Sequence, residues 1–335
     1  MSLYDLLAEL PLRVERYELD RLEQQVSSGF TRVTTVIRLR GAGEEGVGED
    51  VTYQAELHPP PHDLPLAGEH RLGSFSDRLD EHDFHPYRRW AFESAALDLA
   101  LREAGRSLAQ ALGRDPRPVT FVVSKRFETI GELRRLLERY PTTRFKLDPT
   151  SDWGEELVGE LAATGAVDTA DLKGAYHGTV VDQPPDPALY RRVAEGFPSA
   201  WIEDPALTPE TDPVLAPHRD RITWDAPIHS VADVDALPFP PRALNVKPSR
   251  FGPLRELLAF YELCEERGIL LYGGGQFELG PGRGQVQYLA SLFCPDAPND
   301  VAPGGYNAVE PADGLPVSPL EPAPAPTGFR WAPRP

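Results

Sequence analysis

The sequence has few cysteines and no long apolar run. Its 335 residues include two cysteines, Cys264 and Cys294, too few for a disulfide framework. Because no secretory pattern opens the chain, we expect both to be reduced thiols in a cytoplasmic protein. No apolar stretch approaches the roughly 20 residues that a membrane-spanning helix needs. The sequence therefore predicts neither a disulfide-stabilised domain nor a membrane protein.

Basic residues are also scarce. The chain has 34 lysines and arginines against 52 acidic residues, a formal net charge of −18. This argues against a nucleic-acid partner, because phosphate backbones are bound by a basic face. An anionic substrate would need local positive charge from a metal ion, a lysine or an arginine. We therefore expect no nucleic-acid or membrane partner, and leave homo-oligomer formation open.

The N-terminal part has the pattern of a small antiparallel sheet followed by a helix. Residues 13–25 and 31–41 alternate polar and apolar side chains on either side of the turn-like VSSGF. A third extended segment is predicted at 50–57, after the glycine-rich turn GAGEEGVGED, and one long helix at 88–112. We expect an α+β capping domain at residues 1–112.

After this domain, strand-like and helix-like segments alternate. Repeated strand–helix units predict a parallel sheet, and about seven or eight of them predict a closed barrel. The expected fold class is α/β, a modified TIM barrel of the (β/α)7β type at residues 113–310; an open doubly wound sheet is the alternative. The proline-rich residues 311–335 are expected to pack back on the capping domain. The strand-like runs begin near residues 119, 144, 167, 200, 221, 243 and 268.

Four consecutive strand-like runs end in a carboxylate or an amine. They are ADLKG with Asp171, WIEDP with Glu203, ITWDAP with Asp225 and LNVKP with Lys247, and the spacings are 32, 22 and 22 residues. Each spacing fits one strand–helix unit, so we expect all four side chains at the same rim of the barrel. Three oxygen ligands suit a hard divalent cation, and a nearby lysine can move a proton. The pattern predicts a metal-dependent active site.

At this point the chain resembles the enolase superfamily, in its muconate-lactonizing and mandelate-racemase-like branch. The resemblance covers nearly the whole chain, including ESAALDLALREAG, VKPSRFG, LYGGGQFELG and the closing GLPVSPLEPAPAPTGFRW. It implies a capping domain over a modified TIM barrel and a Mg²⁺ cofactor held by Asp171, Glu203 and Asp225. It also implies that Lys247 and Lys146 are the catalytic amines on opposite sides of the barrel.

Two positions beside the expected acids and amines depart from the family pattern. The second strand usually has Lys-x-Lys, but here it is FKLDP, so Lys146 stands at the first lysine and Asp148 at the second. A shifted alignment would make Lys146 the second lysine. The family often has Asp-x-Asn at the first metal acid, and this chain has Asp171-Leu-Lys173. These departures concern the expected two-base chemistry and leave the expected fold unchanged.

The expected reaction begins with removal of a proton next to a carboxylate, which creates an enediolate. Mg²⁺ supplies positive charge where the negative charge develops, and a lysine base must be partly neutral near neutral pH. We predict a Mg-dependent lyase or isomerase of the o-succinylbenzoate synthase or cycloisomerase type, acting on a small carboxylate. The alternatives are an acid-sugar dehydratase and a non-catalytic enolase-like binding protein. A dipeptide epimerase is disfavoured, because its usual Asp-x-Asp is replaced by Gln276-Phe-Glu278.

Four further residues are candidate substrate-binding groups: Ser124, Lys173, Gln276 and Glu278. The last two lie in the glycine-rich segment 273–285, which lacks the Gly-Lys-Ser/Thr of a phosphate-binding loop. We expect the N-terminus of the following helix to favour an anion, although a tight strand-to-helix turn would also explain the glycines. Capping loops near 21–30 and 51–62 are expected to enclose the substrate.

Overall fold

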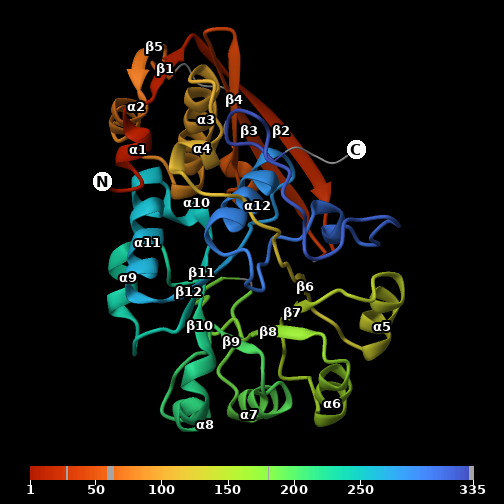
Figure 1. Ribbon diagram of the computed structural model, residues 1–335. Helices are drawn as coiled ribbons and strands as arrows, with labels where there is room; N and C mark the ends of the chain where they lie inside the picture. The colour runs from red at the N-terminus through yellow and green to blue at the C-terminus, as the bar shows by residue number, and fades with distance from the viewer. Residues whose placement is uncertain (28, 59–63, 180, 332–335) are drawn as a thin grey trace.

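The computed structural model describes residues 1–27, 29–58, 64–179 and 181–331 (Figure 1). In Figure 1 an antiparallel sheet with its helices, here called the capping domain, lies above a curled parallel sheet ringed by helices, the barrel. The capping domain consists of α1 (Asp5–Ala8), β1 (Pro11–Val14), β2 (Arg16–Gln25), β3 (Thr31–Gly41), β4 (Glu44–Asp50), a 3₁₀ turn (Ala55–Leu57), β5 (Gly68–Arg71), α2 (Leu72–Leu79), α3 (Pro86–Glu103) and α4 (Leu108–Leu112).

The predicted hairpin of the capping domain is confirmed. Strands β2 and β3 pair antiparallel from Arg16 opposite Arg40 to Gln25 opposite Thr31. Strand β4 adds to the other side of β3, and β1 pairs separately with β5. Because β2 continues to Gln25, the first half of the capping loop predicted near 21–30 is strand, and the connecting segment begins only at residue 26.

The third strand was predicted in the wrong place. It is β4, within the glycine-rich segment taken for a turn, whereas residues 51–58 contain only a 3₁₀ turn. The glycines of β4 serve close packing against α3. A Cβ built on Gly46 would lie 2.1 Å from the carbonyl oxygen of Ala95, and one on Gly48 would lie 2.0 Å from that of Ala91. The absence of side chains lets α3 approach the strand.

The single helix predicted at 88–112 is two helices. Helix α3 ends at Glu103, and α4 begins at Leu108 after a new N-cap, Ser107, whose hydroxyl accepts the backbone N–H of Gln110. Between them Gly105 has φ +63°, a left-handed conformation that ends helices. Periodicity alone did not reveal this break.

The parallel sheet follows chain order, β6 to β12, with each strand beside the next. Helices lie outside it (Figure 1). The strands are β6 (Val123–Lys125), β7 (Phe145–Leu147), β8 (Val167–Asp171), β9 (Trp201–Glu203), β10 (Ile222–Trp224), β11 (Ala243–Val246) and β12 (Leu270–Gly273). The helices are α5 (Ile130–Arg139), α6 (Glu155–Ala163), α7 (Pro187–Gly196), α8 (Asp212–Leu215), α9 (Val231–Ala236), α10 (Pro248–Phe251), α11 (Leu254–Arg267) and α12 (Pro281–Phe293), with 3₁₀ turns at Ala216–Arg221 and Gly304–Asn307.

An eighth extended segment closes the barrel between β12 and β6. Asn299 forms a parallel bridge with Phe121, just before β6, and Asp300 forms one with Gly274, just after β12. The N–H of Asp300 donates to the carbonyl of Gly273 at 2.7 Å, and the N–H of Val122 donates to that of Asn299 at 2.8 Å. The expected (β/α)7β class is therefore confirmed. The first barrel strand begins at Val123, later than the predicted residue 119.

Residues near the C-terminus contact the capping domain. The carbonyl of Gly328 accepts the N–H of Leu108 at 3.1 Å. The buried Asp98 carboxylate of α3 accepts the N–H of Phe329 at 2.8 Å and the Arg330 guanidinium at 2.7 Å. Within the described residues, no helix is long and apolar enough to cross a membrane, and Cys264 and Cys294 are buried free thiols.

Candidate active site

Three carboxylates meet at the rim formed by the carboxyl ends of the barrel strands. Asp171 ends β8, Glu203 ends β9 beside it in register, and Asp225 directly follows β10. One oxygen from each lies within 4.8 Å of the other two, and all three side chains are buried. Hard divalent cations such as Mg²⁺ and Ca²⁺ prefer such oxygen ligands. The three residues, called the acid triad here, therefore fit a divalent metal ion.

Basic side chains neutralise the triad. The Lys146 ammonium lies 3.0 Å from Asp171 Oδ2 and also contacts Glu203 Oε1. The Lys247 ammonium donates to Asp225 Oδ2 at 2.8 Å. Both amines predicted to be catalytic thus contact the triad, Lys146 at Asp171 and Glu203 and Lys247 at Asp225. Lys247 packs against Gly274, where a Cβ would lie 2.8 Å from its Cε.

The two lysines differ in their pKa. Burial opposes the charge of Lys146, but the Asp171 and Glu203 carboxylates outweigh it and hold the pKa of its ammonium well above the ordinary value. For Lys247, burial has the larger effect and lowers the pKa of the ammonium despite the neighbouring Asp225. Of the two amines, Lys247 therefore releases a proton more readily.

Several residues that hold the triad were missed from the sequence. The Tyr272 hydroxyl, on β12, donates to Glu203 Oε2, and the Asn245 amide, on β11, lies 3.4 Å from the same oxygen. Strand alternation would have predicted that both face the interior. It would not have indicated Glu203 as their common acceptor, because that contact crosses the barrel.

The Asp225 carboxylate has further donors. The Tyr176 hydroxyl donates to its Oδ2 at 2.6 Å and the Arg250 guanidinium to its Oδ1 at 2.7 Å. Asp204 accepts the backbone N–H groups of Asp225 and Ala226, each at 2.8 Å. Tyr176 lies in a loop without any regular pattern, so no sequence signal indicated it.

Replacing Tyr272 with phenylalanine tests one of these contacts. The change removes a hydroxyl that donates to Glu203 Oε2 and lies 3.2 Å from Thr223 Oγ1. We expect about a tenfold loss of metal affinity, typical of removing an outer-shell donor, measured by calorimetry. Tyr261→Phe is the matched control, because this buried tyrosine packs on Phe293. Equal affinities for the two variants would contradict the prediction.

Ser124 and Lys173 lie at the same rim as the triad. Ser124 pairs in register with Lys146, so the two side chains leave their strands on the same face. The Lys173 ammonium contacts Asp171 Oδ2 and lies 3.7 Å from Asp148 Oδ1. Asp148 therefore faces the site, as strand alternation from Lys146 predicts.

Gln276 and Glu278 are bonded to other protein groups beneath the capping domain. The Gln276 side-chain oxygen accepts the Tyr53 hydroxyl at 2.8 Å, and its amide donates to the Tyr87 hydroxyl at 3.1 Å. Glu278 accepts the N–H of Gln276 at 2.6 Å and pairs with Arg283 at 2.9 Å. Both are nearly inaccessible, at 3% and 5% exposure. Gln276 therefore joins the two domains, whereas Glu278 is bonded within the barrel.

Arg32 of β3 also joins the domains. Its guanidinium, with no exposed surface, donates to the carbonyl of Thr52 at 2.8 Å and to that of Gln276 at 2.9 Å. It lies 4.3 Å from the centre of the Tyr53 ring. This contact holds the described part of the predicted capping loop 51–62 against the barrel; residues 59–62 lie outside the described residues.

The N-terminus of α12 is capped by a carboxyl group of the protein. Glu49 of β4 accepts the N–H of Leu279 at 2.7 Å, of Gly280 at 3.0 Å and of Gly282 at 2.9 Å. A protein side chain thus occupies the helix N-terminus at which an anion was expected. The side chain that meets it comes from the capping domain, which no local pattern indicates.

Replacing Glu49 with alanine is expected to lower the free energy of unfolding by about 3 kcal/mol, because it leaves the buried N–H of Gly282 and the partly buried N–H groups of Leu279 and Gly280 without an acceptor. Chemical denaturation would measure this change. The exposed Glu23 of β2 gives a control, and Glu23→Ala should change stability by less than about 0.5 kcal/mol. Equal denaturation midpoints for the two variants would show that the cap contributes nothing.

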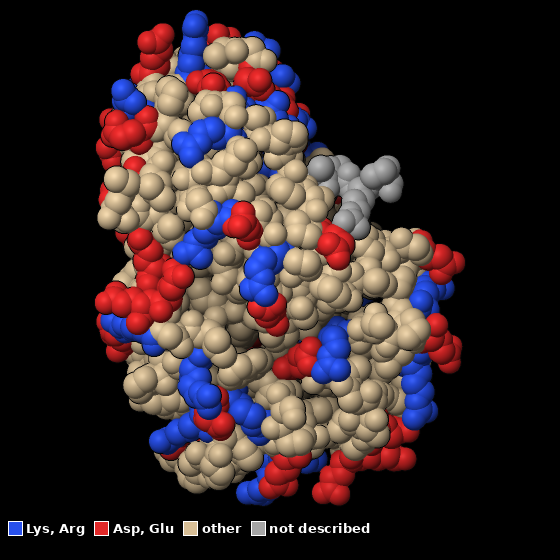
Figure 2. All heavy atoms as spheres, viewed as in Figure 1, with Lys and Arg blue, Asp and Glu red and all other residues tan. Residues whose placement is uncertain are grey.

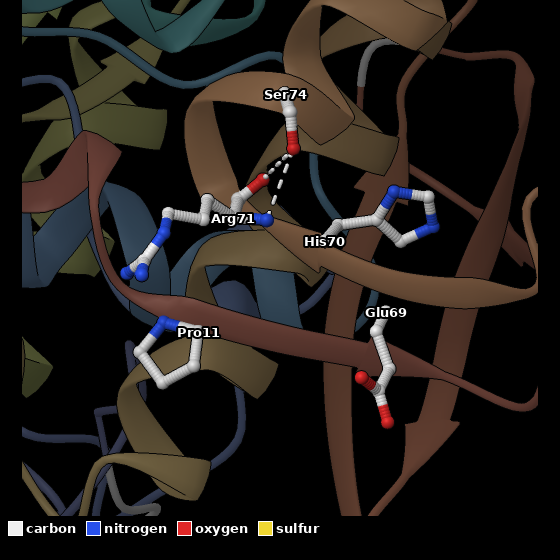
Figure 3. Close-up of a pocket in the computed structure, with 5 residues that line it drawn as sticks. All are labelled: Pro11, Glu69, His70, Arg71 and Ser74. Carbon is white, nitrogen blue, oxygen red and sulfur yellow. Dashed lines mark hydrogen bonds between the residues drawn. The ribbon is translucent and has the colours of Figure 1, made fainter.

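An open hollow of about 370 Å³ lies at the edge of the capping domain (Figure 3). It is lined by Pro11, Glu69, His70, Arg71 and Ser74. The Ser74 hydroxyl is hydrogen-bonded to both the N–H and the carbonyl of Arg71, each at 3.0 Å, and so caps α2. No triad residue lines this hollow. On the face in Figure 2, acidic and basic side chains are interspersed.

Sequence relatives of the chain are enzymes. It is 29% identical to an o-succinylbenzoate synthase from Geobacillus stearothermophilus over 230 residues, 64% of this chain and 59% of the synthase. It is 27% identical to an N-succinylamino acid racemase from Thermus thermophilus over 345 residues, 92% of this chain and 89% of the racemase. The chain thus spans less than two thirds of the synthase that it matches.

Solved structures share the fold. A putative mandelate racemase/muconate-lactonizing enzyme from Roseovarius nubinhibens, complexed with magnesium, superposes with a TM-score of 0.71 and 17% identity, over 95% of this chain and 96% of that one. The chain therefore has the fold of these structures, a capping domain over a modified TIM barrel, as the resemblance predicted.

The particular family is narrower. Two family models match the chain, the N-terminal domain of DUF8230 at residues 5–111 and its C-terminal domain at residues 115–308, both described as domains of unknown function. The chain belongs to the DUF8230 family.

Proposed function

We propose that the protein is a Mg²⁺-dependent enzyme that removes a proton α to a carboxylate. The observation that carries this proposal is the acid triad, with three buried oxygens within 4.8 Å of one another and the Lys247 ammonium 2.8 Å from one of its members. Bound Mg²⁺ would supply fixed positive charge beside the substrate carboxylate. Asp171, Glu203 and Asp225 would hold it.

The two amines have different roles in this proposal. Lys247, whose pKa is lowered by burial, moves the substrate proton. Lys146 stays charged between Asp171 and Glu203 and orients their carboxylates. This division replaces the two-base arrangement implied by the family pattern. The reason for this division is that the Lys146 ammonium is bonded to two triad carboxylates.

The proposed reaction is a lyase or isomerase step on a small carboxylate, of the o-succinylbenzoate synthase or cycloisomerase type. The relatives named as a synthase and a racemase of succinylated compounds support this class. Lys173, Lys247 and Arg250 each contact a carboxylate of the acid triad, and cations at this position support an anionic substrate. A cytoplasmic location stays a prediction, and homo-oligomer formation stays open.

Proton exchange in deuterium oxide tests the proposal. The protein with Mg²⁺ is incubated with a panel of carboxylates, including N-succinylamino acids and acid sugars, and loss of the α-proton signal is followed by NMR. We expect exchange with at least one succinylated compound and none after chelation of the metal. Metal binding without exchange of any acid would favour the binding protein. Exchange and dehydration of acid sugars alone would favour the dehydratase.

A further inference from the structure

We propose that Lys173 is a built-in counter-ion that competes with the metal for Asp171 and transfers to Asp148 when the metal binds. The inference rests on the proposed metal site and assigns a function to both departures from the family pattern. The side chain at 173 replaces the usual asparagine, and the one at 148 stands where a lysine is usual.

The first observation is crowding at one oxygen. Asp171 Oδ2 is contacted by the Lys173 ammonium and lies 3.0 Å from that of Lys146. A metal ligated by Asp171 would therefore meet two ammonium groups. Lys146 has a second acceptor on the triad, Glu203, whereas Lys173 contacts no other triad member among its ion pairs in the described residues. Lys173 is the cation that a metal would displace.

The second observation is another acceptor within reach of the Lys173 ammonium. Asp148 Oδ1 is buried and has no hydrogen-bond partner within the described part of the chain. It lies 3.7 Å from the Lys173 ammonium, just beyond hydrogen-bonding distance. A small rotation of the flexible lysine stem would complete this bond. Because a divalent cation repels the ammonium, binding favours that rotation.

The backbone at residue 173 fixes where this amine begins. Lys173 has φ +54°, and its N–H donates to Asp171 Oδ1 at 3.1 Å. The ring of Tyr176 lies 5.0 Å from the ammonium. The left-handed conformation favours asparagine over lysine, so the lysine is retained at some cost in backbone strain. Lys173→Asn is consequently a variant that we expect to fold.

Mn²⁺ binding measured by calorimetry tests the inference without reference to turnover. We expect Lys173→Asn to bind Mn²⁺ at least about tenfold more tightly than the unchanged protein, because a repelling charge is removed. Asp148→Asn should weaken binding about tenfold, because Lys173 then stays on Asp171. The double variant, with both Lys173→Asn and Asp148→Asn, should bind Mn²⁺ less than about threefold more weakly than Lys173→Asn alone.

Lys125→Asn provides the control. Lys125 ends β6, the strand beside β7, and burial is the one cause that shifts the pKa of its ammonium, to about 8. It should change Mn²⁺ affinity less than about threefold. A structural role for Lys173 would give unchanged or weaker binding on replacement. If the unchanged protein binds Mn²⁺ and Lys173→Asn binds it no more tightly, this inference is overturned, but the proposed metal site is not. If neither the unchanged protein nor any variant binds Mn²⁺, both this inference and the proposed metal site are overturned.

Discussion

Replacing Lys247 with methionine is expected to reduce α-proton exchange by about a thousandfold, the usual scale for losing a general base. Metal affinity should not fall, because the substitution removes an ammonium 2.8 Å from Asp225 Oδ2 and leaves the carboxylate in place. Methionine keeps a long unbranched stem against Gly274, so the packing there is preserved.

Deuterium exchange by NMR and Mn²⁺ calorimetry, made on the same preparation, separate these two effects. Lys125→Met is the matched control, with the same substitution at the end of another barrel strand, and should retain exchange within about threefold. Exchange that persists in Lys247→Met would exclude Lys247 as the base. Parallel loss of exchange and of metal binding would instead indicate a damaged site.

Replacing Asp225 with asparagine is expected to weaken metal binding more than about a hundredfold, since even outer-shell changes cost about ten- to a hundredfold. Proton exchange should disappear with it. The side-chain oxygen of asparagine can still accept the Arg250 guanidinium, which lies 2.7 Å from Asp225 Oδ1. We therefore expect the variant to fold, which circular dichroism would verify.

Asp300 provides the comparison for this experiment. Its carboxylate lies 3.8 Å from the Lys146 ammonium but is not part of the acid triad. Asp300→Asn removes the same charge near the site and should weaken Mn²⁺ binding less than about tenfold. If Asp225→Asn and Asp300→Asn lose affinity equally, net charge rather than ligation explains the effect. A Glu203→Gln variant that binds Mn²⁺ with unchanged affinity would also contradict the assignment of Glu203 as a metal ligand.

The acid triad was predictable because a barrel repeats. The spacing of Asp171, Glu203 and Asp225 matches successive strand–helix units, and parallel strands deliver their ends to one rim. The same repeat predicted Lys247 beside them. Residues that support the triad from across the barrel, such as Tyr272, follow no spacing and were missed.

Local sequence pattern failed to predict two extended segments that are rich in glycine or proline. Strand β4 was taken for a turn because it contains Gly46 and Gly48, which in fact admit the backbone of α3. The closing segment APNDVAP has no strand-like alternation, yet Asn299 and Asp300 bridge both edges of the barrel. In each case a distant element determines the conformation.

By itself, the order of residues determined the kind of fold, the three acids and the lysine beside them, because periodicity and spacing are properties of the chain. Only the tertiary structure decided which cation meets which carboxylate: Lys146 with Asp171 and Glu203, Lys247 with Asp225, and Lys173 between Asp171 and Asp148. Charges interact through a few ångströms of space, and that separation exists only once strands far apart in the chain have closed into a barrel.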